Sequence, residues 1–89
     1  MIHLNISIDG RVQGVGFRFT ARNQARNLNI YGFIKNLCDG SVYIEAEGQP
    51  EQINEFVSWC YKGPPGARVT NVKIEEGKLN NFKYFEIKH

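Results

Sequence analysis

The chain has 89 residues, 42% of them apolar and spread along its length, which fits a single globular domain over residues 1–89. Its formal net charge is +2, from 11 basic and 9 acidic residues, so it lacks the dense basic stripe that binds a long nucleic acid. No apolar stretch is long enough to span a membrane, and the N-terminus lacks the basic start and apolar block of a signal peptide, so we expect a cytoplasmic protein.

Cysteine and histidine usage indicates neither a disulfide framework nor a metal site. Cys38 and Cys60 are the only cysteines, in a chain with an ordinary apolar content and no export signal, so we expect no disulfide. Together with His3 and His89 they lack the spacing of zinc ligands. We therefore expect no metal and no other cofactor. Cys60 belongs to an apolar helical stripe and is expected to be buried, whereas Cys38 lies beside a turn and is expected to be more exposed.

The first half of the chain alternates between strand and helix patterns. Apolar and polar residues alternate over 2–9, which predicts a half-buried strand. A glycine-rich loop over 10–16 follows, and an apolar stripe over 17–29 predicts a helix. Second and third strands are predicted over 30–37 and 41–47.

A turn and a second helix are marked by glycine and proline. Asp39 and Gly40 predict a tight hairpin turn in which both central residues have positive φ. The second helix is predicted to begin near Pro50 and to end at the Gly-Pro-Pro-Gly run over 63–66. Its core stripe consists of Ile53, Phe56, Val57 and Cys60.

A fourth strand over 68–76 and a short final strand over 83–88 give the order βαββαβ plus a terminal strand. This order predicts an α+β, ferredoxin-like sandwich, with an antiparallel sheet and two helices on one face. In that fold the first two strands run the same way with the third between them. Their carboxyl ends therefore lie at one edge of the sheet, two steps of about 4.8 Å apart.

The loop after the first strand has the chemistry of an anion site. Its glycine spacing matches neither the dinucleotide fingerprint nor the Walker loop. Glycines nevertheless let backbone N–H groups approach an anion, and the following helix adds a partial positive charge at its N-terminus. Arg18 lies in the first turn of that helix, where its planar guanidinium can bind two phosphate oxygens. The alternative is a plain glycine-rich connection with Arg18 on the surface.

The segment Gly10-Arg11-Val12-Gln13-Gly14-Val15-Gly16-Phe17-Arg18 resembles the signature of the acylphosphatase family. Gly32-Phe33-Ile34-Lys35-Asn36, followed by Asp39-Gly40-Ser41-Val42, resembles its second block. The similarity continues through 46–48, 63–69 and 85–87, although Cys38 stands where the family often has proline or another residue. The resemblance implies a metal-independent hydrolase that converts acyl phosphates to a carboxylate and inorganic phosphate.

The resemblance also implies roles for particular residues. Arg18 would bind the phosphoryl group and Asn36 would orient the attacking water. The backbone N–H groups that complete the cradle would be those of Gln13, Gly14, Val15, Gly16 and Phe17. Substrates of this kind include acetyl phosphate, carbamoyl phosphate and 1,3-bisphosphoglycerate. We expect a monomer with no nucleic-acid or membrane partner. Taken alone, Asn36 is more typical of a residue at a strand end or turn.

The chemistry requires few other groups. A carboxylate is a good leaving group, so no general acid is needed, and positioning with electrostatic stabilisation suffices. We hypothesise that a phosphate oxygen of the substrate accepts the proton of the attacking water, because an asparagine cannot take it. His3, at the opposite edge of the sheet, and His89, at the terminus, are expected to be surface residues that do not act as bases.

Other acidic and aromatic residues that could suggest a site have a simpler interpretation. Glu45 and Glu47 alternate on the third strand and are expected to lie on its solvated face rather than to form a catalytic pair. Glu75 and Glu76 have the same interpretation. Trp59 and Tyr61 are expected to cover the rim of the core.

A binding module is the alternative to an enzyme. Tyr31, Phe33 and Tyr43 form a candidate platform for stacking RNA bases on the open face of the sheet. The third strand, however, lacks the basic-glycine-aromatic pattern of RNA-binding sheets and carries two acids. A second alternative is an acylphosphatase-like domain that has lost turnover and serves a larger assembly.

Overall fold

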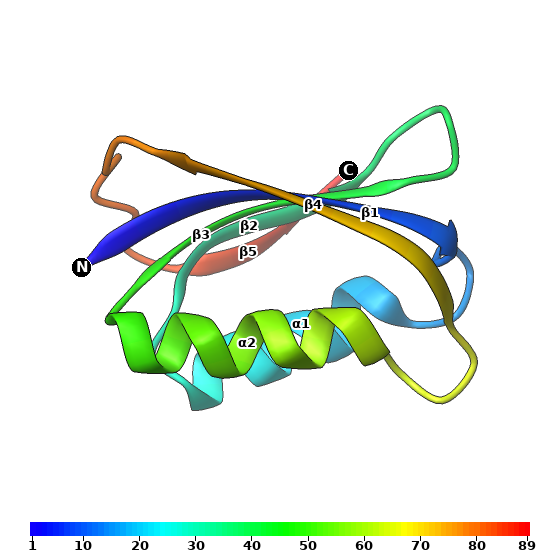
Figure 1. The fold of residues 1–89 in the computed structure, drawn as a ribbon, viewed down its shortest axis with the longest axis horizontal. Helices are drawn as coiled ribbons and strands as arrows, with labels where there is room; N and C mark the ends of the chain where they lie inside the picture. The colour runs from blue at the N-terminus through cyan, green and yellow to red at the C-terminus, as the bar shows by residue number, and fades with distance from the viewer.

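The computed structural model describes residues 1–89 and packs two helices against one face of a five-stranded sheet (Figure 1). The elements are β1 (Ile2–Arg11), α1 (Phe17–Asn27), β2 (Tyr31–Asn36), β3 (Val42–Gly48), α2 (Pro50–Lys62), β4 (Arg68–Gly77) and β5 (Phe85–Lys88). The predicted order and fold class are therefore confirmed. Neither helix is long and apolar enough to span a bilayer.

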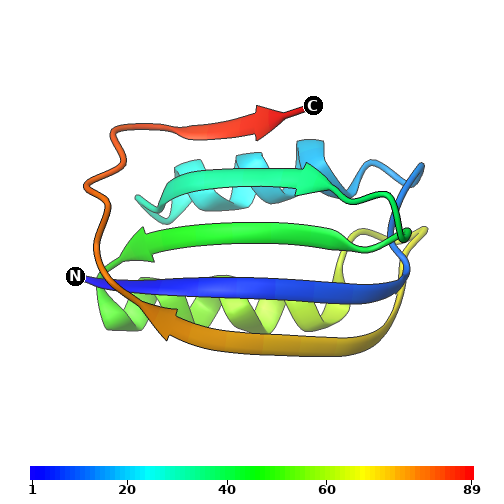
Figure 2. The same cartoon turned by 90° about the horizontal axis from the view of Figure 1, so that it is seen from above.

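The sheet has the order β4-β1-β3-β2-β5, and every neighbouring pair is antiparallel except β2 and β5, which are parallel. β1 and β2 run in the same direction with β3 between them (Figure 2). In the register of this sheet, Val42 pairs with Ile8 on one side and with Asn36 on the other. The last residues of β2 and of β1 therefore lie at the same edge of the sheet, as the sequence predicts.

One apolar core fills the space between the sheet and the helices. The predicted stripe of α1 is buried at Phe17, Ala21 and Ala25, and that of α2 at Ile53, Phe56 and Cys60. The Phe17 ring packs on Trp59 with centroids 5.2 Å apart, which fixes the first turn of α1 against α2. Burial raises the pKa of the Cys60 thiol, whereas Cys38 is exposed.

The hairpin between β2 and β3 differs from the predicted turn. Only Gly40 has a positive φ, of 93°, so the expectation that Asp39 shares this conformation is wrong. Leu37 N donates to Ser41 O, which closes a three-residue loop over residues 38–40. The Asp39 carboxylate accepts hydrogen bonds from the Ser41 hydroxyl and backbone N–H, and these bonds lower the pKa of Asp39. A side-chain cap thus stabilises this turn where a second left-handed residue was expected.

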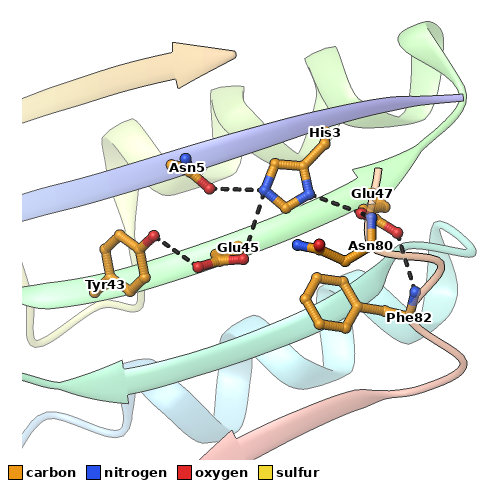
Figure 3. Close-up of polar contacts among 7 residues, drawn as sticks. All are labelled: His3, Asn5, Tyr43, Glu45, Glu47, Asn80 and Phe82. Carbon is orange, nitrogen blue, oxygen red and sulfur yellow. Dashed lines mark hydrogen bonds and ion pairs between the residues drawn. The ribbon is translucent and has the colours of Figure 1, made fainter. Parts of the chain in front are cut away.

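The sheet face opposite the helices carries a buried polar cluster (Figure 3). Glu47 is 2% exposed and His3 is 3% exposed, so the expectations that both lie at the surface are wrong. The Glu47 carboxylate accepts hydrogen bonds from His3 Nδ1 at 2.7 Å, from the Phe82 N–H at 3.1 Å and from the Asn80 N–H. The physical reason is that the connection from β4 to β5 folds over this face and supplies donors to the carboxylate.

The hydrogen bonds to Glu47 outweigh the effect of its burial. Burial alone raises the pKa of a carboxyl group, but the N–H groups of Asn80 and Phe82 and the His3 imidazole stabilise the charged form. The net result is a pKa of Glu47 below its ordinary value. Glu47 is therefore a buried acceptor that holds the connection from β4 to β5.

Neighbouring side chains extend this cluster and close part of the open face. The Glu45 carboxylate is half-buried and accepts the Tyr43 hydroxyl at 2.8 Å. Burial and this bond raise the pKa of Tyr43 to about 12. Phe33 is 8% exposed and meets the Phe82 ring edge-on at 5.8 Å. The Lys88 ammonium lies over the same ring, 4.2 Å from its centroid. The candidate platform for RNA is therefore covered at its centre, because Lys88 and Phe82 shield Phe33 from solvent.

Candidate active site

A hollow of about 370 Å³ lies at the edge where β1 leads into α1 and β2 ends. Its lining residues are Val12, Gly14, Gly16, Phe17, Arg18, Phe19, Arg22, Asn36, Ile87 and His89. Arg18 and Asn36 thus face one space, although β3 lies between the strands that carry them. The topology brings together the two side chains that sequence analysis singled out. No group of three or more histidine, cysteine or acidic side chains is arranged to hold a metal ion.

The loop before α1 presents free backbone donors at this hollow. None of the N–H groups of residues 13–17 donates a hydrogen bond to another atom of the protein. Gly14 and Gly16 have φ values of 73° and 79°, and a Cβ at either position would meet nothing within 4 Å. Glycine is therefore required there for the left-handed backbone and not for space. Gly16 also begins α1 without a side-chain cap, which leaves the helix N-terminus open to an anion.

The Gln13 side chain ties this loop to the neighbouring hairpin. Its Nε2 donates to Leu37 O at 2.8 Å and to Ser41 O at 2.9 Å. Gln13 and Val15 do not line the hollow, and Val15 packs against the apolar core. The sequence pattern indicated a role only for the backbone of Gln13 and not for its side chain, because the two acceptor carbonyls are 24 and 28 residues away. The bond couples the position of the loop to the end of β2.

Arg18 is half-buried in the first turn of α1 and has no acidic partner. The ion pairs in the structure involve only His3, so no carboxylate lies within 4.0 Å of Arg18. Its Nη1 donates to His89 Nδ1 at 3.3 Å. His89 is exposed, as expected, but it also lines the hollow, which the sequence did not indicate. β5 brings it there by running parallel to β2, a pairing that no local pattern predicts.

Asn36 is the last residue of β2, and its side-chain oxygen has no protein partner. Asn36 Oδ1 is buried and accepts no hydrogen bond from the chain. Leaving such an atom unsatisfied costs about 1–3 kcal/mol, so a ligand that donates a hydrogen bond is favoured at this position. An attacking water is a ligand of this kind.

Arg22 is a second guanidinium in the hollow, and sequence analysis missed it. It lies one helical turn after Arg18, and its guanidinium carbon is 5.1 Å from the centroid of the Phe19 ring. Its Nε is buried and has no hydrogen-bond partner in the protein. The one available signal was the i, i+4 spacing from Arg18, which puts both side chains on one face of α1.

The family model for acylphosphatase matches residues 4–87 of the chain. The chain belongs to the acylphosphatase family. It is 45% identical over 87 residues to an acylphosphatase of Archaeoglobus fulgidus, with 98% of each chain covered. It is 42% identical to an acylphosphatase of Bacillus licheniformis, with 100% of both chains covered. Its structure is similar to the crystal structure of acylphosphatase from Bacillus subtilis, with a TM-score of 0.97, 37% identity and full coverage of both chains.

Membership of the acylphosphatase family at this identity and coverage identifies the chain as an enzyme. It has acylphosphatase activity, and its substrates are acyl phosphates. The resemblance seen in the two sequence blocks is confirmed over almost the whole chain. The hollow at the edge of the acylphosphatase sheet is the candidate active site.

Proposed function

We propose that this acylphosphatase holds the phosphoryl group of an acyl phosphate with Arg18 and the N–H groups of residues 13–17, and that Asn36 orients the attacking water. The observation that carries the proposal is the shared hollow. It combines a guanidinium without an acidic partner, the free backbone donors of Gly14, Gly16 and Phe17, and a buried amide oxygen without a protein partner.

The phosphoryl group is recognised by charge and geometry. Phosphoryl transfer passes through a loose transition state whose charge is spread over three equatorial oxygens. The guanidinium of Arg18 can bind two of these oxygens, and the N–H groups at the start of α1 can donate to the rest. Because no carboxylate lies within 4.0 Å of Arg18, its positive charge is available to the anion.

The attacking water is oriented by Asn36 and loses its proton to the substrate. Asn36 Oδ1 accepts one hydrogen of the water, but an amide is not a base at neutral pH. The water oxygen forms a bond to phosphorus while the bond from phosphorus to the acyl oxygen breaks. The carboxylate leaves with the electron pair, and the proton of the water passes to a phosphoryl oxygen. The step therefore balances without a general acid or a protein base.

The proposal is tested by following the hydrolysis of acetyl phosphate in water enriched in ¹⁸O, with and without EDTA. We expect one inorganic phosphate for each acetyl phosphate consumed, with the label in phosphate and with turnover unchanged by the chelator. Label in acetate would show attack at the carbonyl carbon and would contradict the role of Arg18. Turnover lost with EDTA would contradict a metal-independent mechanism.

A further inference from the structure

Arg22 is a second positive charge beside the proposed phosphoryl site. It follows Arg18 by one turn of α1, a rise of about 6 Å along the helix, and both residues line the same hollow. No carboxylate lies within 4.0 Å of either guanidinium, because the ion pairs of the structure involve only His3. Two like charges at this spacing disfavour the free helix slightly, and an anion that both guanidinium groups can reach would offset this repulsion.

The Arg22 side chain is packed against its neighbours, but its guanidinium has N–H groups without a hydrogen-bond partner in the protein. The side chain is half-buried, with its guanidinium against the Phe19 ring and its Nε buried without a protein partner. Arg26, one turn further along α1, is exposed and lines a different hollow. Arg22 therefore differs from an ordinary solvated arginine of the same helix face.

The position of Arg22 relative to the loop separates its task from that of Arg18. The proposed phosphoryl cradle is made by residues 13–17 and Arg18 at the N-terminus of α1. Arg22 lies one turn beyond this cradle and lines the same hollow, so it faces the space left for the acyl part of the substrate. Phe19 and Ile87 supply apolar wall next to it. A hollow of about 370 Å³ is within the range of small-molecule sites and can hold a ligand with two charged ends.

We propose that Arg22 binds a second anionic group on the acyl chain, so that the enzyme prefers acyl phosphates whose acyl part carries a carboxylate or a phosphate. The inference depends on the proposed function of Arg18 and the loop, since those groups place the phosphoryl end. A planar guanidinium recognises either oxyanion in a bidentate manner.

The test compares benzoyl phosphate with 3-carboxybenzoyl phosphate, whose rigid ring keeps the carboxylate from attacking its own anhydride. We expect kcat/KM to be about tenfold higher for the carboxylated substrate, as one charge-assisted hydrogen bond allows. Arg22→Gln should bring the ratio of the two kcat/KM values close to one. Arg26→Gln removes the same charge from the same helix and should leave the ratio unchanged.

Binding of unreactive ligands gives a second readout that does not require turnover. Calorimetry should show 3-phosphonopropanoate binding about tenfold more tightly than propylphosphonate, and Arg22→Gln should abolish the difference. If the unsubstituted enzyme showed no preference for the carboxylated member of either pair, the inference would be overturned. An Arg22→Gln protein that loses activity on both benzoyl phosphates equally would also overturn it, because Arg22 would then act on the phosphoryl group. Failure to hydrolyse either benzoyl phosphate would instead overturn the proposed function, while the phosphonate comparison still decides the role of Arg22.

Discussion

The imidazole of His3 and the carboxylate of Glu47, 44 residues apart in the chain, meet at 2.7 Å on the sheet face that carries no helix. The same carboxylate accepts the backbone N–H groups of Asn80 and Phe82. These bonds fix the connection that delivers β5 to the side of β2. β5 carries Ile87 and leads to His89, and both residues line the active-site hollow. The His3–Glu47 pair, at the opposite edge of the sheet, therefore helps to position one wall of that hollow.

Glu47→Gln is expected to destabilise the fold. Glutamine keeps the size of the side chain but removes the charge that three donors stabilise. The loss should be about 2–4 kcal/mol in the free energy of unfolding at neutral pH, measured with urea. Glu76→Gln, at an exposed position of β4, is the matched control and should change stability by less than about 0.5 kcal/mol.

The pH dependence of that loss follows from the lowered pKa of Glu47. A carboxyl group with a pKa below its unfolded value contributes stability that is present above the unfolded pKa and is lost as pH falls through the folded pKa. The free energy of unfolding should therefore begin to decline as the pH falls below the ordinary glutamate pKa of 4.5. The Glu47→Gln protein should show a flatter decline, and two parallel curves would contradict the assignment.

Asn36→Ala is expected to reduce kcat about 10²-fold, by analogy with the loss of one positioned transition-state group. Inorganic phosphate should bind almost as tightly as before, because Arg18 and the loop remain. Steady-state kinetics with acetyl phosphate and the inhibition constant of phosphate give the two values. Asn71→Ala, on the exposed surface of β4, should leave both unchanged. An Asn36→Ala protein with ordinary kcat would refute the role of the side chain.

Arg18→Lys tests whether bidentate geometry matters beyond charge. Lysine keeps the positive charge but binds as a single point, so we expect kcat/KM and phosphate affinity each to fall by at least about tenfold. The exposed Arg11 offers the matched replacement, Arg11→Lys, for which no change is expected. Normal phosphate binding by the Arg18→Lys protein would show that the guanidinium is not a clamp.

Gln13→Glu is expected to uncouple the loop from the β2–β3 hairpin. The new carboxylate would face the carbonyls of Leu37 and Ser41, which now accept the Gln13 amide, so two hydrogen bonds become repulsions. We expect a loss of about 1–3 kcal/mol in the free energy of unfolding and a lower kcat/KM for acetyl phosphate. Gln52→Glu in α2 makes the same chemical change away from the hollow and should affect neither. Equal behaviour of the two variants would rule out a coupling role for Gln13.

The periodicity of the chain was sufficient to predict the elements and the sheet edge that carries the site. The alternation in β1 and the apolar stripes of α1 and α2 each depend on residues close together in the chain, so local patterns report them. The order of elements then places β1 and β2 in the same direction, which brings Arg18 and Asn36 to one hollow. The placement of Arg18 and Asn36 at one edge thus follows from short-range residue spacing together with the rules of chain topology.

Tertiary structure alone decided the features that depend on distant partners. Glu47 belongs to a strand pattern typical of a solvated face, yet the connection over residues 78–84 folds across it and supplies its donors. His89 reaches Arg18 over a separation of 71 residues because β5 pairs in parallel with β2. Arg22 becomes a candidate only when its Nε is found buried in the hollow without a partner. The burial of these polar groups and their long-range hydrogen bonds are properties of the assembled sheet, and a local sequence pattern does not report them.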